Sequence, residues 1–194
     1  MLTEEDEFDE ETFEGSDFRG ATLRSKSFSD CEFRECSFQK ADFRYSVFEN
    51  CRLSGCDLTM ALVADARFLD VEFKDCKLMG IDWSQVSGLV FSVGFTRCVL
   101  SHGSFIDLAM KNVRVIDCRA DETNFSGSNL QGADFSRTNL EAAKFAGADL
   151  TRADLSQATN YAINPNDSIL RDTRFSIGAA LAVAKRMGIV VPGE

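Results

Sequence analysis

The sequence predicts an all-β solenoid, in which short coils stack along one axis, followed by a short C-terminal α-helix. Three observations predict this fold. A Phe or Leu recurs every five residues, a small residue precedes it by two positions, and an Ala- and Leu-rich stretch follows the last repeat. A period of five matches neither an α-helix, with about 3.6 residues per turn, nor a strand, with about two. A fixed short period is typical of architectures built from stacked units.

The large residues form two runs that differ in phase. The first run starts at Phe8 and reaches Trp83 in steps of five, with Val63 as its exception. The second run starts at Phe95 and reaches Leu155, and it is irregular between residues 110 and 120. We expect the large residue and the small residue before it to face inward, because the other three positions of each unit are mostly polar. Stacked units then bury what no single unit can bury alone.

Several units follow the pattern Ala-Asp/Asn-Leu/Phe plus two further residues. They include Ala41-Asp42-Phe43, Ala133-Asp134-Phe135-Ser136-Arg137 and Ala148-Asp149-Leu150-Thr151-Arg152. Over residues 11–175 this pattern resembles the pentapeptide-repeat family. The resemblance implies a right-handed quadrilateral β-helix with four units per coil, so that equivalent positions lie about 20 residues apart. Phe8, Phe28, Phe48 and Phe68 are then expected to stack in one column, with coils about 4.8 Å apart.

One continuous repeat predicts a single solenoid domain over residues 11–175. We expect an acidic N-terminal segment or cap over residues 1–10, and a capping or dimerisation helix with a tail over residues 176–194. The net charge is −10, and eight acidic residues near the N-terminus account for most of it, leaving 23 acidic residues against 21 basic ones. The eight are Glu4, Glu5, Asp6, Glu7, Asp9, Glu10, Glu11 and Glu14. Such a charged run is typical of a solvated end, and it also gives a terminal coil a polar outer face.

The seven cysteines all occupy the small inward position of the repeat. They are Cys31, Cys36, Cys51, Cys56, Cys76, Cys98 and Cys118. Stacked cysteines about 4.8 Å apart approach disulfide distance. Buried thiols in odd number, without an export signal, favour a reduced chain in the cytoplasm. Because their spacing follows the repeat and no His is near, we expect neither a metal site nor a cofactor. No apolar run approaches the length of a membrane span.

The change of phase implies two added residues within 84–94, next to the single tryptophan, Trp83. Two interpretations remain open. In one, the insertion is a bulge that repacking absorbs. In the other, the apolar residues around it, Phe91, Ile106 and Ile116 together with Trp83, form an exposed surface for a protein partner.

Two features follow the last regular repeat. Residues 159–167 predict a loop with turn chemistry that leaves the phase unchanged. Ser176 is a good N-cap for a helix from Ile177 to Met187, which Gly188 ends. One face of this helix is expected to cover the last coil. By resemblance to part of the pentapeptide-repeat family, it also implies a homodimer, for which we take Ile177, Leu181, Ala184 and Met187 as the contact residues.

The sequence offers no catalytic constellation, because its single histidine, His102, has no nucleophile beside it in the repeat. We therefore expect a protein that is not an enzyme, and a rigid interaction module for an unidentified protein partner. A second interpretation comes from resemblance to Qnr-type quinolone-resistance proteins, which implies a DNA mimic that binds DNA gyrase or topoisomerase IV. Glu10, Asp30 and Asp70 fall on one outward line that fits such mimicry, although many arginines interrupt the field. A purely structural scaffold is the third interpretation. Direct nucleic-acid binding is not expected, since the chain is acidic.

Overall fold

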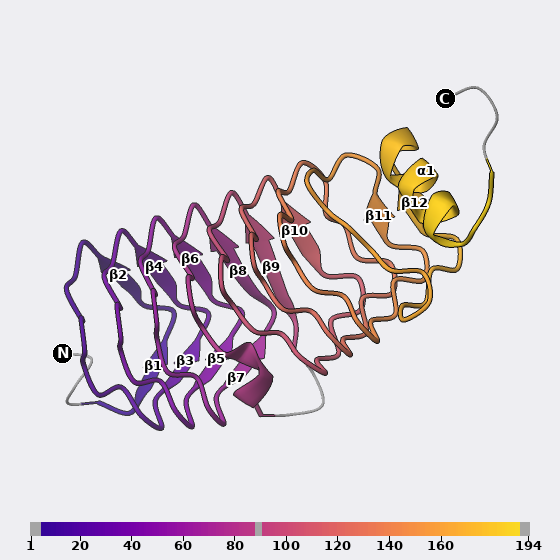
Figure 1. Ribbon diagram of the computed structural model, residues 1–194. Helices are drawn as coiled ribbons and strands as arrows, with labels where there is room; N and C mark the ends of the chain where they lie inside the picture. Colours follow the sequence, from indigo (N-terminus) through magenta and orange to yellow (C-terminus); the bar gives the residue numbers. More distant parts are fainter. Residues whose placement is uncertain (1–4, 88–90, 191–194) are drawn as a thin grey trace.

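The computed structural model describes residues 5–87 and 91–190. The chain winds into a rod of about eight coils with one short helix at its C-terminal end, and the two ends of the chain lie at opposite ends of the rod (Figure 1). This confirms the all-β solenoid expected from the five-residue period. Residues 88–90, inside the predicted phase change, and the outermost residues of both terminal segments lie outside the described part.

Parallel pairing between coils gives the rod its faces. Face A contains β1 (Glu7–Asp9), β3 (Ser27–Ser29), β5 (Val47–Glu49) and β7 (Arg67–Leu69). Face B contains β2 (Thr12–Glu14), β4 (Glu32–Arg34), β6 (Arg52–Ser54), β8 (Val71–Lys74), β9 (Val93–Thr96) and β10 (Arg114–Ile116). Faces C and D are held by single bridges such as Asp17 to Ser37 and Thr22 to Asp42. Because Phe8 pairs with Phe28 and Phe13 with Phe33, each coil consists of four five-residue units.

We number the coils from the N-terminus by this register. Coils 1 to 8 are residues 6–25, 26–45, 46–65, 66–87, 91–107, 108–127, 128–147 and 148–167, and a partial ninth turn covers 168–175. Most units end at a corner where the backbone φ is positive. Gly fits this left-handed conformation, and Asp and Asn tolerate it better than other residues. Gly20, Asp30 and Asn50 are examples.

The core is a set of side-chain columns that run along the axis. Phe48 lies over Phe68 with ring centroids 5.0 Å apart and planes 2° from parallel. Within one coil, Phe28 meets Phe33 edge-to-face at 5.4 Å. These two arrangements are the ones that aromatic rings prefer, so each ring gains contacts both along and across the rod. The seven cysteines are buried and free, and they fill the small positions as expected.

The two added residues change the register of face B without breaking it. Phe73 of β8 pairs with Phe95 of β9, a step of 22 residues, whereas neighbouring strands keep a step of 20. The strands of face A end at β7, directly before this change. Trp83 begins a short 3-10 helix, η1 (Trp83–Gln85), and its ring is fully buried. The geometry therefore corresponds to the first interpretation, a bulge absorbed by repacking.

Both ends of the rod have their own closing elements. At the N-terminal end, Lys26 replaces the usual small inward residue, is buried, and binds the carboxylate of Asp6 at 2.8 Å. At the other end, β11 (Asp154–Leu155) pairs with β12 (Arg174–Phe175), a step of 20 residues, so the loop between them leaves the register unchanged. The helix α1 (Ile177–Arg186) follows, and the Ser176 hydroxyl accepts a bond from Ala179 N at 3.3 Å. No helix in the described part is both long and apolar enough to cross a membrane.

Candidate functional site

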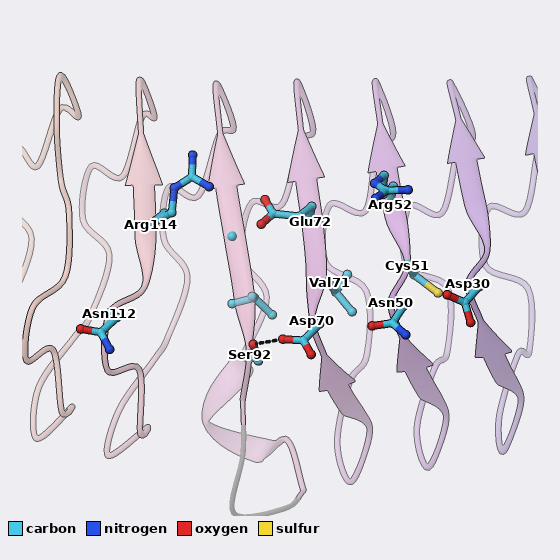
Figure 2. A pocket seen from close by; sticks show the side chains of 12 residues that line it. Asp30, Asn50, Cys51, Arg52, Asp70, Val71, Glu72, Ser92, Asn112 and Arg114 are labelled. Carbon is cyan, nitrogen blue, oxygen red and sulfur yellow. Dashed lines mark hydrogen bonds between the residues drawn. The ribbon is translucent and has the colours of Figure 1, made fainter.

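A groove of about 510 Å³ follows the edge between faces A and B. Figure 2 shows two rows of side chains along it. The first row stands on the corner and contains Asp30, Asn50, Asp70 and Asn112. The second row stands on face B and contains Arg52, Glu72 and Arg114, from β6, β8 and β10. The coil register creates both rows, because it brings one outward position of each coil next to the same position of the following coil.

Gly94 leaves a gap in the second row, between Glu72 and Arg114. The Glu72 carboxylate lies over this bare backbone, since a Cβ built on Gly94 would stand only 2.7 Å from Glu72 Oε1. Figure 2 shows that Glu72 and Arg114 both lean toward this gap. The two side chains are farther apart than an ion pair, and within the described part of the chain neither has a hydrogen-bond or ion-pair partner. A carboxylate and a guanidinium are therefore available here to an outside group.

Arginines without a carboxylate partner gather on the two faces that share this edge. Five described arginines of the coils have no carboxylate oxygen within 4.0 Å, namely Arg52, Arg67, Arg114, Arg152 and Arg171. All five belong to face A, face B or the corner between them. The arginines of faces C and D, in contrast, are each paired with an aspartate. These are Arg19 with Asp17, Arg24 and Arg44 with Asp42, and Arg119 with Asp121.

At the corner between faces B and C, aspartates and arginines of successive coils form ion pairs with each other. Asp75, Arg97, Asp117 and Arg137 follow one another there, coil by coil. Arg97 binds Asp75 at 2.6 Å, and Arg137 binds Asp117 at 2.5 Å. The hydrogen bonds from these guanidinium groups lower the pKa of Asp75 and of Asp117 below its usual value. These four charges are therefore paired within the chain, whereas Glu72 and Arg114 at the edge between faces A and B are not.

The structure separates the residues predicted to form an interaction surface. Glu10, Asp30 and Asp70 do lie exposed on one corner, as expected from the period. Trp83 and Phe91 instead lie in the core, where Phe91 is only 8% exposed and packs against Trp83, Phe68 and Phe105. The expected apolar surface around them is therefore corrected: Phe91 fills the space that the two added residues open beside Trp83.

The remaining predicted residues are dispersed. Ile106 and Ile116 are half-buried, Ile106 on face D and Ile116 on face B, so they share no surface. On α1, Leu181 and Ala184 are half-buried, but Ile177 is 83% and Met187 59% exposed. The helix turns Ala179 and Val183 toward Tyr161 and Ile163, so Ile177 is not part of the covering face that we expected.

Three exposed apolar side chains, Tyr45, Met60 and Leu62, lie on face D and its two corners. Tyr45 and Met60 have φ values of 67° and 58°. An exposed apolar residue in this conformation destabilises the fold in two ways: its backbone is strained, and its apolar surface is in contact with water. His102, the single histidine, lies two coils beyond Met60 on the same corner, with Nδ1 3.4 Å from Glu122 Oε2. No group of three metal-binding side chains occurs among the described residues.

Comparison with known proteins fixes the family. The profile described as "Pentapeptide repeat region" matches residues 26–87 and 90–164, more than half of the chain. The chain belongs to the pentapeptide-repeat family. The two matched segments meet at the added residues, and together they cover the coils that line the groove. The fold of this family member is thus the right-handed quadrilateral β-helix implied by its repeats.

Two solved structures are similar to this chain to different degrees. A trypsin-treated variant of QnrB1, titled a plasmid-mediated fluoroquinolone resistance protein, is 24% identical, with a TM-score of 0.51 over 95% of this chain and 89% of its own. HetL, titled a pentapeptide-repeat protein involved in heterocyst differentiation regulation from the cyanobacterium Nostoc, is 16% identical, with a TM-score of 0.32 over 86% of each chain. No curated protein matches the sequence.

Proposed function

We propose that this protein is a rigid, non-enzymatic interaction module, and that the edge between faces A and B binds a protein partner. One observation carries the proposal: arginines without an internal partner collect on the two faces that share this edge, while those of the other two faces are paired. Charged side chains lose favourable interactions when their complements are absent, so a surface that leaves them unpaired in one place is suited to a charged partner.

The signs of the charges favour a protein over a nucleic acid. The groove carries Glu72 and Asp30 beside Arg52 and Arg114. A polyanion would meet repulsion from the carboxylates along the same groove, whereas a protein surface offers both signs. The side chains project from strands held on both sides by other coils, so little backbone entropy is lost on binding.

Affinity capture with charge-reversed variants tests this function. Arg52→Glu and Arg114→Glu should each reduce the recovery of bound protein at least tenfold relative to the original chain. Lys144→Glu is the matched control, since Lys144 is an exposed cation on face D. Equal recovery by all four proteins, each with an unchanged circular dichroism spectrum, would count against the edge as the binding surface.

A second candidate partner is a type II topoisomerase. It is supported by the exposed acidic line Glu10, Asp30 and Asp70, and by the likeness in fold to a fluoroquinolone resistance protein. The measurement is DNA gyrase supercoiling, with and without a quinolone, in the presence of micromolar protein. Inhibition or protection that is lost in the Asp30→Lys variant supports this partner. No effect of the folded protein over that range rejects it.

Homodimerisation through α1 is a further part of the proposal. Ile177 and Met187 expose apolar surface at the end of the rod, next to the half-buried Leu181 and Ala184. A double variant, Ile177→Asp with Met187→Asp, should lower the sedimentation coefficient, because it removes the association through α1. An unchanged coefficient would remove the helix from the interface. Seven free buried thiols support a reducing location, the cytoplasm, for the assembled protein.

A further inference from the structure

Opposite charges stand at the two ends of the edge between faces A and B. Asp9 and Asp30 stand in coils 1 and 2, whereas Arg152 and Arg171 stand in coil 8 and in the partial ninth turn. Several coils separate the two groups, so these residues cannot meet within one chain. On the corner between faces B and C, by contrast, acid and base follow one another and pair directly.

We propose that the partner of this edge is a second copy of the chain, lying antiparallel with its own edge facing the first. This inference rests on the proposed interaction function and names the partner. An antiparallel copy presents the same columns in reverse order, so its basic end faces the acidic end of the first copy. A two-fold axis perpendicular to the rods relates them, and every contact therefore occurs twice.

One position of the two-fold axis brings four pairs of oppositely charged residues face to face. Placed at coil 5, the axis sets coil 4 against coil 6, coil 3 against coil 7, coil 2 against coil 8, and coil 1 against the ninth turn. The pairs, each formed with the second copy, are Glu72 with Arg114, Arg52 with Asp134, Asp30 with Arg152, and Asp9 with Arg171. All four keep to their own column, and all four share one midpoint. Equal coil spacing, about 4.8 Å in both rods, lets them form together.

The centre of this arrangement is bare. Gly94 and the small Ser92 occupy coil 5 on the two rows of the groove. On the axis each faces its own counterpart, so the backbones can approach closely where a larger side chain would hold them apart. Glu72 and Arg114, which lean toward Gly94 from either side, then reach the second copy near the axis.

The opposing contacts are few. Glu10 would face Asp172 of the second copy. Among the described residues of these columns, this is the one contact between like charges in which neither carboxylate is bound within its own chain. Glu32 also faces Asp154, but each is already bound within its own chain, Glu32 to Arg34 and Asp154 to Arg174. Exposed ion pairs are individually weak, so the association depends on their number and falls with salt.

Complementary charge reversal tests the arrangement. Glu72→Arg and Arg114→Glu each turn two attractive contacts into repulsive ones and should weaken self-association at least about tenfold in sedimentation equilibrium. In an equal mixture, the arginine introduced in one variant faces the glutamate introduced in the other, and the retained Glu72 faces the retained Arg114. The mixture should therefore associate as tightly as the background chain that carries neither reversal. Lys144→Glu is the control, and both reversals are made in a background with Ile177→Asp and Met187→Asp, so that contacts of α1 do not contribute.

A cysteine cross-link adds a second measurement. Ser92→Cys should give a disulfide-linked dimer under mild oxidation, because Ser92 faces itself across the axis, whereas Ser29→Cys should not. Absence of that dimer, or singly reversed variants that associate as well as their mixture, overturns the proposal. If the chain is monomeric yet captures another protein that Arg114→Glu loses, the inference fails and the proposed interaction function stands.

Discussion

Arg97 lies one coil beyond Asp75 and donates two hydrogen bonds to its carboxylate, from Nε to Oδ1 at 2.6 Å and from Nη2 to Oδ2 at 2.7 Å. Arg137, one coil beyond Asp117, binds that carboxylate in the same way. A repeat of about 4.8 Å places equivalent side chains within reach of each other, so the order of charges along a column decides whether they pair inside the rod.

These pairs predict how stability depends on pH. The folded-state pKa values of Asp75 and Asp117 are lowered by their arginines, so both groups stabilise the fold fully above the unfolded pKa of about 3.9. That contribution is lost as the pH falls through the lower, folded values. Urea denaturation at pH 7 and pH 3 should show a smaller difference in stability for Asp75→Asn than for the original chain. An equal difference would mean that solvent screens the pair completely.

Trp83 predicts a contrast between two substitutions. Its ring is fully buried among Phe68, Phe73 and Phe105, but its Nε1 has no hydrogen-bond partner in the described structure. Trp83→Ala leaves a large cavity and should cost about 3–5 kcal/mol. Trp83→Phe loses less volume and also removes the unsatisfied N–H, so it should cost no more than about 1.5 kcal/mol. Chemical denaturation measures both, and similar losses would contradict this account.

Two glycines predict opposite tolerance of an added methyl group. A Cβ on Gly94 meets only the end of the exposed Glu72 side chain, which can turn away, so Gly94→Ala should change stability by less than about 0.5 kcal/mol. A Cβ on Gly103 would lie 2.9 Å from the backbone oxygen of Leu100. This backbone atom cannot move away as a flexible side chain can. Gly103→Ala should therefore cost about 1–3 kcal/mol. Thermal unfolding of the two variants gives the comparison, and a reversed order would refute it.

Met60 predicts a stabilising substitution. It combines an exposed side chain with a φ of 58°. Met60→Gly relieves left-handed strain, partly offset by greater freedom of the unfolded chain, and should stabilise the fold by about 0.5–1 kcal/mol. Lys40→Gly, at the same corner one coil earlier, has the same φ and should behave alike. A loss of stability in Met60→Gly alone would show that Met60 makes a contact worth more than its strain.

The cysteines predict protection from alkylation. Burial raises the pKa of Cys51 to about 12, so almost none of it is thiolate at neutral pH. Iodoacetamide at pH 8 should leave the folded protein unmodified and should modify all seven cysteines after unfolding in guanidinium. Mass spectrometry counts the adducts. Rapid modification of Cys51 in the folded protein would contradict its burial.

Most of the fold could be predicted because one large inward residue per unit, such as Phe28 or Phe95, repeats along the sequence. Two features could not. Phe91 stands outside the phase of either run, so periodicity alone places it in a surface loop, and only the space beside Trp83 reveals its burial. The groove also depends on the 22-residue step, because stepping by 20 from Glu72 leads to Ser92 and misses Gly94. Lys26 is a third case, because it occupies an inward position that usually holds a small residue. Its burial there is explained only by its bond to Asp6.

The ladder bonds between coils, such as Phe38 N to Asp57 O at 2.7 Å, run along the axis of the rod. A mechanical load applied between its two ends would therefore act on these bonds lengthwise and open them one coil at a time, in contrast to strands sheared past one another, where many bonds resist together. Bending loads four stacked faces at once. The molecule should consequently behave as a stiff strut under compression or bending, and yield at low, regularly spaced forces when it is pulled.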